Sequence, residues 1–111
     1  MNFSTIFENF KILSAGTDAF KQLKNNCESA LQKNTISLEH SSLFLIYGFA
    51  KNYVLLYEDE AVESEFASSA KEQLLSYMQI LNNALQSNQS HIILEVQNKI
   101  SYQYMQSSRI F

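Results

Sequence analysis

The chain has 111 residues, of which 46% are hydrophobic, and this predicts one folded domain over residues 1–111 and excludes a largely disordered protein. The net charge is −3 and the 8 basic residues are scattered, which argues against binding to nucleic acid. No window approaches the roughly 18 apolar residues of a membrane span, so no membrane association is expected. A single cysteine excludes an internal disulfide, and a lone thiol suits a reducing compartment. The N-terminal segment lacks the basic start of a signal peptide, so we expect a cytoplasmic protein.

The secondary structure is predicted to be all-α. The chain has no proline and only 2 glycines, which is too little turn chemistry for a β-rich domain of this size. Apolar residues at helical spacing predict five helices, at about residues 4–15, 18–33, 38–57, 64–86 and 91–105. The stretch HIILEV in the fifth segment also suits a strand, but it lacks strict alternation and a partner strand, so a helix is favoured. Residues 107–111 are expected to be irregular.

Residues that cap helices mark the expected starts of four of these segments. Ser, Thr and Asp side chains accept hydrogen bonds from the free N–H groups of a first helical turn. Such residues precede or begin the apolar patterns, so each expected helix start is fixed to within a residue or two. The expected caps are Ser4 or Thr5 for the first helix, Thr17 or Asp18 for the second, Ser37 for the third, and Asp59 or Ser64 for the fourth.

The third segment differs from the others because it is apolar nearly all round. Only a thin strip of His40, Lys51 and Glu58 is polar. A helix of this kind is normally surrounded by others, so we expect it to be the central helix of a single compact domain of five helices. Gly48 lies in its middle and is expected to permit close packing of a neighbouring helix.

An acidic cluster follows this helix and is the strongest candidate for a site. It contains five of the 11 acidic residues: Glu58, Asp59, Glu60, Glu63 and Glu65. One interpretation is structural, because Glu63 and Glu65 lie near the first turn of the fourth helix, where the helix dipole favours anions. The other is functional, because clustered carboxylates attract basic ligands and speed association. The regular spacing of a calcium-binding loop is absent, so no metal is expected.

Tyrosine is the second residue type that deserves a functional interpretation. Tyr57 adjoins the acidic cluster, and tyrosine is over-represented among residues that dominate binding energy, so Tyr57 joins the cluster as a candidate partner-binding residue. The simpler interpretation of the tyrosines is that their rings lie in the core with the hydroxyl groups at the surface. The others are Tyr47, Tyr53, Tyr77, Tyr102 and Tyr104.

The sequence contains no motif that indicates catalysis. His40 and His91 stand alone, without the spacing of metal ligands. Cys27 lies on the apolar stripe of the second helix, where a thiol behaves as a small inert hydrophobic group. No phosphate-binding loop, dinucleotide-binding motif or nucleophile-elbow motif occurs. We therefore expect no enzyme activity, no catalytic residue and no cofactor.

The leading functional hypothesis is a protein that binds another, more basic protein through residues 57–65 and blocks it by steric and electrostatic occlusion. In size, acidity and helical character the chain is similar to bacterial immunity proteins, which sit on a toxin and block it. This similarity is one of overall profile, with no shared motif.

Two other hypotheses belong to different classes. One is that the chain holds a small molecule in a pocket beside the central helix, in which case Tyr47, Tyr53 or Phe49 is expected to line a cavity. The other is that it is the structural subunit of a homo-oligomer such as a homodimer. The residues that suggest an oligomer contact lie outside the main apolar stripes: Leu75, Ile80, Leu94 and Met105.

Overall fold

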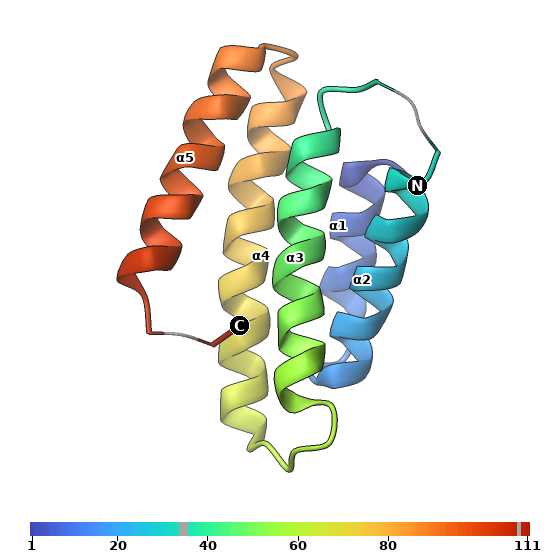
Figure 1. Cartoon of the computed structure of the whole chain (residues 1–111), viewed down its shortest axis with the longest axis vertical. Helices are drawn as coiled ribbons and strands as arrows, with labels where there is room; N and C mark the ends of the chain where they lie inside the picture. Colours follow the sequence, from blue (N-terminus) through green and yellow to red (C-terminus); the bar gives the residue numbers. More distant parts are fainter. Residues whose placement is uncertain (34–35, 109) are drawn as a thin grey trace.

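The prediction of an all-α domain is confirmed. The computed structural model describes residues 1–33, 36–108 and 110–111, and these form one compact globule of five helices without a strand. The stretch HIILEV belongs to a helix, so the alternative of a strand is excluded. The helices are α1 (Phe3–Ile12), α2 (Thr17–Leu31), α3 (His40–Tyr57), α4 (Ser64–Gln86) and α5 (Ser90–Gln106) (Figure 1).

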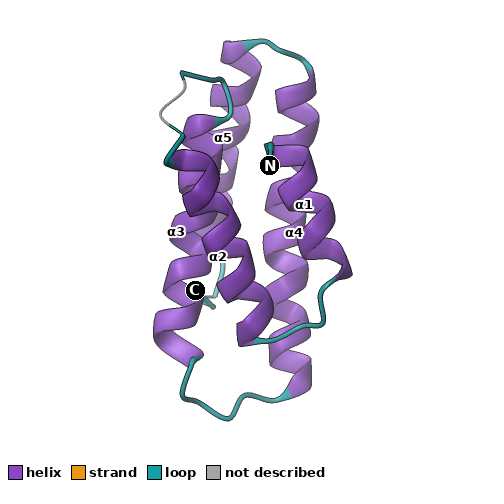
Figure 2. Cartoon of the chain, turned by 90° about the vertical axis from the view of Figure 1, so that its right-hand side faces the viewer, coloured by secondary structure: helices purple, strands orange, loops and turns teal. Residues whose placement is uncertain are grey.

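Successive helices run in opposite directions along the long axis of the domain. α2 and α3 pack closely, α1 lies against α2 and α4, and α4 also contacts α3 and α5. Figures 1 and 2 together show α3 at the front, with α2 on one side and α5 on the other, and α1 and α4 behind. α3 and α5 therefore stand as two ridges that run in the same direction, with α4 behind the space between them.

Aromatic rings fill the centre of the bundle. Phe20 of α2 stacks on Tyr53 of α3, with ring centroids 3.8 Å apart and an interplanar angle of 14°. The edge of the same ring meets Phe10 of α1, with centroids 5.4 Å apart. All three side chains are fully buried. Burying one large apolar side chain contributes roughly 1.5–3 kcal/mol to stability, so these three rings stabilise the packing of α1, α2 and α3.

The caps of the helices differ from the predicted ones. The Oδ1 atom of Asn2 caps α1 and accepts a hydrogen bond from the Thr5 backbone N at 2.9 Å. Gly16 begins α2 at a φ of 138°, a conformation that favours glycine. Residue type alone does not show at which residue the helical hydrogen bonds begin. The N-cap residues of the first four helices are Asn2, Gly16, Glu39 and Glu63, so Ser4, Thr5, Thr17, Asp18, Asp59 and Ser64 were wrong. Ser37 is not the N-cap of α3, but its Oγ accepts a hydrogen bond of 2.9 Å from the Glu39 backbone N in the turn that leads into α3.

α3 crosses the middle of the domain, but it is not surrounded. Its inner face is buried, whereas Phe44 and Leu55 are 63% and 71% exposed and Leu56 is 40% exposed. The physical reason is that α2 packs closely along one side of α3 and α5 touches the other side only at Ser42 and Phe49 among the contacts described, and no helix of the described residues lies over its outer face (Figure 2). The expectation that a nearly all-apolar helix lies wholly inside the fold is therefore wrong for this face.

Gly48 lies on this outer side of α3. A Cβ atom built at Gly48 meets no atom within 4 Å among the described residues. The expectation that Gly48 permits close packing of another helix of the chain is therefore wrong.

The segment 107–111 is irregular where it is described, as predicted, but its end is anchored in the core. Phe111 is fully buried. Its ring centroid lies 5.2 Å from that of Phe49, 6.5 Å from that of Tyr77 and 6.2 Å from that of Tyr104. The hydroxyl group of Tyr104 also donates a hydrogen bond to the carbonyl oxygen of Phe111. The tail thus returns across α4 to the front face and joins α3, α4 and α5 (Figure 1).

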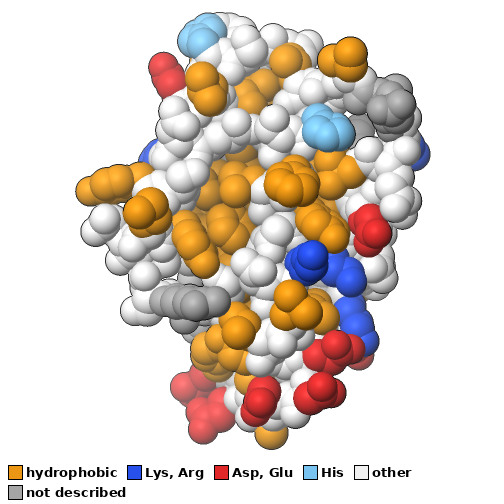
Figure 3. Space-filling view, viewed as in Figure 1, with side chains coloured by type: hydrophobic (Ala, Val, Ile, Leu, Met, Phe, Trp, Pro, Cys, Tyr) orange, Lys and Arg blue, Asp and Glu red, His pale blue; other side chains and the backbone are white. Residues whose placement is uncertain are grey.

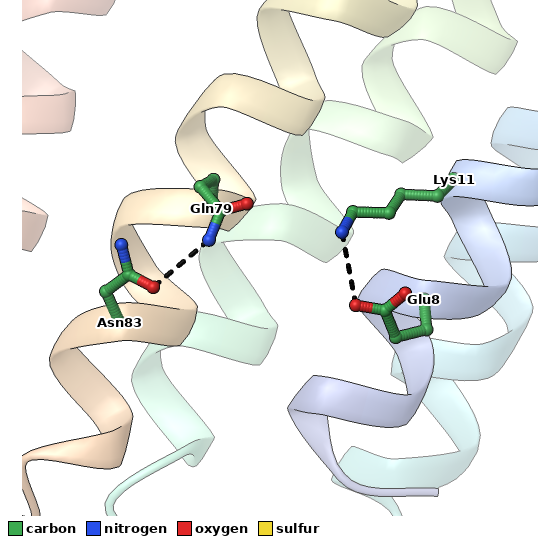
Figure 4. Close-up of polar contacts among 4 residues, drawn as sticks. All are labelled: Glu8, Lys11, Gln79 and Asn83. Atoms are coloured by element: carbon green, nitrogen blue, oxygen red, sulfur yellow. Dashed lines mark hydrogen bonds and ion pairs between the residues drawn. The ribbon is translucent and has the colours of Figure 1, made fainter.

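Other outer faces are ordinary solvated helix surfaces. Lys11 pairs with Glu8 at 3.2 Å along α1, and the Nε2 atom of Gln79 donates to Oδ1 of Asn83 at 3.0 Å along α4 (Figure 4). Pairs at these spacings contribute about 0.2–0.5 kcal/mol each. Compared with these faces, the front face over α3 is unusually apolar.

Candidate protein-interaction surface

The acidic cluster lies at one end of the domain, in the turn from α3 to α4 and in the first turn of α4. The antiparallel arrangement of the two helices brings these residues to one place. Figure 3 shows acidic side chains gathered at the lower end of the front face. All five residues of the cluster are exposed: Glu58, Asp59, Glu60, Glu63 and Glu65. They form a negatively charged surface that is accessible to a partner.

One carboxylate of the cluster has a counterion within the domain. Lys21 of α2 forms an ion pair with Glu58, and the hydrogen bond and charge of Glu58 raise the pKa of Lys21. Both side chains are almost half exposed, so water and salt screen the pair. Among the described residues, no other ion pair involves the cluster. Most of its negative charge is therefore not neutralised internally.

Two residues of the cluster also have a structural role at the start of α4. Glu63 is the N-cap residue of α4, and its carbonyl accepts a hydrogen bond from the Ala67 backbone N at 3.0 Å. Glu65 lies in the first turn of α4. The predicted position of both carboxylates at the positive end of the α4 dipole is confirmed, and this position favours their negative charge.

Tyr57, the last residue of α3, packs its ring against the aromatic core next to the turn between α3 and α4. Its side chain is half-buried, and its ring centroid lies 4.8 Å from that of Tyr53 and 5.0 Å from that of Phe66. The apolar groups beside the cluster that are open to solvent are Leu55 and Leu56. The structure thus brings Tyr57 to the cluster, although much of its ring is used in packing.

The remaining tyrosines only partly follow the expectation that their rings lie in the core with the hydroxyl groups at the surface. The hydroxyl group of Tyr77 accepts a hydrogen bond from Gln73 at 2.9 Å, and Tyr102 is exposed. Tyr53 is different, because its buried hydroxyl group has no hydrogen-bond partner among the described residues. Burial, and secondarily the nearby Tyr57, raises the pKa of Tyr53.

A groove lies between α3 and α5 on the front face. Its two walls are joined by a hydrogen bond of 2.9 Å from Nε2 of Gln97 to Oγ of Ser42, and by the rings of Phe49 and Tyr104, with centroids 4.9 Å apart. The groove contains two open hollows of about 300 and 210 Å³. The first is lined by Ser37, Leu38, Ser41, Ser90, Ile93, Leu94 and Gln97, and the second by Phe44, Leu45, Gly48, Phe49, Asn52 and Tyr104.

The sequence suggested a pocket beside the central helix, lined by Tyr47, Tyr53 or Phe49, only as an alternative. Phe49 lines the second hollow, whereas the part that α5 contributes was not predicted. A signal for the groove does exist in the residues by which α3 lines the two hollows. Ser41, Leu45, Gly48 and Asn52 follow one another at intervals of four, three and four residues. This spacing marks a helix face that meets another helix. The sequence alone does not reveal that this face lacks a partner within the chain.

The residues considered for an oligomer contact do not form one face. Leu75 and Ile80 are partly buried against the core. Leu94 and Met105 are 56% and 79% exposed, and their spacing of three helical turns places them on one side of α5. A further hollow of about 330 Å³ between α4 and α5 is lined by Ile80, Asn83, Ala84, Ile92, Val96 and Lys99.

The histidines and the cysteine are not gathered into a site. His40 and His91 are exposed at the starts of α3 and α5. Cys27 is fully buried, and burial raises the pKa of its thiol to about 12, so the reactive thiolate is strongly disfavoured. Among the described residues, no group of three or more His, Cys, Asp or Glu side chains is placed to hold a metal ion.

Comparison with known proteins gives no match: no family model, curated protein or solved structure is similar to this chain. Within the described residues, no helix combines the length and the apolar character that crossing a membrane requires.

Proposed function

We propose that this protein binds another protein, a basic one, through a surface made of the acidic cluster and the exposed apolar side chains of α3. One observation carries the proposal. The exposed Leu55 and Leu56 lie within one turn of Glu58, so an apolar surface leads directly to a group of carboxylates. Aliphatic contacts supply binding energy, whereas clustered charge steers a partner of opposite sign and fixes its orientation.

The proposed mechanism is occlusion. Long-range attraction brings a basic partner to the acidic end, and the apolar side chains then exclude water from the contact. The bound domain covers the partner's surface, which is how a small inhibitor of the immunity type acts. This mechanism requires no catalytic residue, metal or cofactor in the domain, and we propose the cytoplasm as its place of action.

The test compares two charge-reversed baits with the wild-type protein. Immobilised protein is incubated with lysate of the source organism, and retained proteins are quantified by mass spectrometry. A basic protein should be retained by the wild type and lost from the Glu58→Lys/Glu60→Lys variant. The Glu72→Lys/Glu95→Lys variant changes the net charge equally at exposed positions elsewhere and should retain it. If the two variants retain the same proteins in the same amounts as the wild type, the proposal fails.

A second candidate function is the binding of a small apolar molecule beside α3. The hollow lined by Phe49 and Tyr104 favours it, since apolar and aromatic walls are typical of ligand sites. Tyr53 adds nothing to this candidate because its side chain is fully buried in the core. Screening fluorescent apolar probes against the wild type and Phe49→Ala tests the idea. Binding that is equal in both proteins would argue against this hollow.

A further inference from the structure

No contact within the described residues explains why a glycine occupies position 48. Glycine in the middle of a helix costs about 0.5–1 kcal/mol relative to alanine because the unfolded chain loses more freedom on folding. Such a residue is normally explained by a neighbour that approaches too closely for a Cβ atom. Here, apart from the neighbouring residues 47 and 49 and the backbone of α3 itself, no described atom lies within 4 Å of the position that the Cβ would take. The close neighbour that would explain Gly48 is therefore sought outside the chain.

The groove that contains Gly48 has the dimensions of a helix-binding site. Along α3 the lining residues run from Ser41 to Asn52, which at a rise of 1.5 Å per residue corresponds to roughly 17 Å, or about three helical turns. On α5 the lining residues are Ser90, Ile93, Leu94 and Gln97 in its first half and Tyr104 near its end. The α3 wall is a helix face with side chains at intervals of three and four residues, the surface into which another helix packs.

The charges around the groove restrict what it can bind. None of the residues that line its two hollows carries a formal charge. The second hollow is mainly apolar and suits an apolar stripe, whereas the first combines apolar side chains with three serines and Gln97. The acidic cluster begins at Glu58, six residues beyond Asn52, or about 9 Å along α3. Figure 3 shows apolar side chains over the middle of the face and acidic ones at its lower end, with basic side chains between them on one side. A complementary ligand is apolar along its length and basic at one end.

We propose that the groove between α3 and α5 binds an amphipathic α-helix of a partner protein. Its apolar stripe lies between the two walls, its backbone passes close to Gly48, and its basic residues lie at the end next to the acidic cluster. Helices bind apolar grooves in this way through side chains at positions i, i+3, i+4 and i+7. This inference rests on the proposed function in taking the partner to be a basic protein, and it adds the form in which the partner is recognised.

The experiment uses displayed peptides as probes. A library of 20-residue peptides, with randomised positions on a helix-favouring framework, is selected on the intact protein. Enriched peptides should share an apolar stripe at helical spacing and Lys or Arg at one end. Selection that yields no common sequence, or sequences without these features, overturns the proposal.

Binding of one enriched peptide is then measured by fluorescence anisotropy. The Gly48→Trp variant fills the groove and should weaken binding by about ten-fold or more, a change that corresponds to roughly 1.4 kcal/mol. Asn25→Trp adds the same bulk to an exposed position on α2 and should leave the affinity within about two-fold, as expected for a residue outside the contact. Circular dichroism verifies folding, and Gly48→Leu replaces Gly48→Trp if the latter does not fold. Equal binding to the groove variant and the wild type overturns the proposal.

Two further measurements separate the possible failures. If Glu58→Lys/Glu60→Lys weakens binding of a basic partner while Gly48→Trp does not, the groove inference fails and the proposed function stands. If neither variant weakens it, both fail. If the wild type dimerises in solution and Gly48→Trp abolishes the dimer, the groove is filled by a second copy of the chain, and a helix of another protein is not its occupant.

Discussion

Glu39 caps a helix that lies 36 residues before it in the chain: its Oε1 accepts a hydrogen bond of 2.9 Å from the backbone N of Phe3. This carboxylate satisfies an otherwise free N–H group at the positive end of α1. Glu39→Ala should therefore destabilise the protein by about 0.5–2 kcal/mol, measured by urea unfolding. Glu39→Gln keeps an acceptor and should lose less. An unchanged unfolding midpoint for Glu39→Ala would show that the contact contributes nothing.

The two glycines should respond in opposite ways to alanine. Gly48 is helical with open space around it, so Gly48→Ala should stabilise the protein by about 0.5–1 kcal/mol. Gly16 has a φ of 138°, so Gly16→Ala should destabilise it by about 1–3 kcal/mol through backbone strain. Thermal unfolding of both variants measures the effects. A loss of stability in Gly48→Ala would mean that the outer side of α3 is covered within the chain.

The aromatic contact between α3 and the tail should contribute strongly to stability. Phe49 and Phe111 are buried, and their rings meet edge to face. Phe49→Ala and Phe111→Ala should each cost about 3–5 kcal/mol, the usual scale for removing a buried phenylalanine. Because the two rings touch, the double variant should lose less than the sum of the single losses. A cost below roughly 1 kcal/mol for Phe49→Ala would refute its place in the core.

The carboxylates of the acidic cluster should divide by their effect on stability. Reversing Glu58 and Glu60 to lysine should change the free energy of unfolding little, because exposed charges are screened by water. Replacing Glu63 and Glu65 with glutamine should cost about 0.3–1 kcal/mol, since both lie at the start of α4, and 1 M salt should reduce this cost. Urea unfolding at low and high salt compares the variants. Equal losses in both pairs would contradict this division.

Cys27 predicts a dependence of stability on high pH. Burial raises the pKa of its thiol from 9.0 to about 12, so the folded protein holds this proton more tightly than the unfolded chain. Its contribution to stability is complete below pH 9.0 and decreases between pH 9.0 and about 12, by at most about 1.4 kcal/mol per pH unit. The difference in unfolding free energy between wild type and Cys27→Ala should shrink over this range. A constant difference would contradict the shift.

Local patterns were enough to predict the fold class and the five helices, because each helix has an apolar stripe that a 3.6-residue period reveals. The same patterns could not place Phe111, which follows the last helix as one residue without a period. They also led to the wrong expectation that α3 is surrounded by other helices. Apolar residues such as Phe44 and Leu55 give the same sequence pattern whether or not another helix covers them. The acidic cluster was found because its residues are close together in the sequence, whereas the groove joins residues 55 positions apart, as in Ser42 and Gln97.

Because the tail is held in the core mainly at its end, we expect it to open at a lower free energy than the rest of the domain. The stack of Phe20 on Tyr53 lies within the closely packed α2–α3 pair, whose amides should exchange with deuterium only on global unfolding. The described residues of 107–111, by contrast, are irregular. They are held by hydrogen bonds of Ser107, by packing of Ile110 against the core, and by the ring and carbonyl oxygen of Phe111. Release of Phe111 would open its site without unravelling a helix. We therefore expect a partial opening, confined to the tail and the lower half of α5, at a lower free energy than global unfolding.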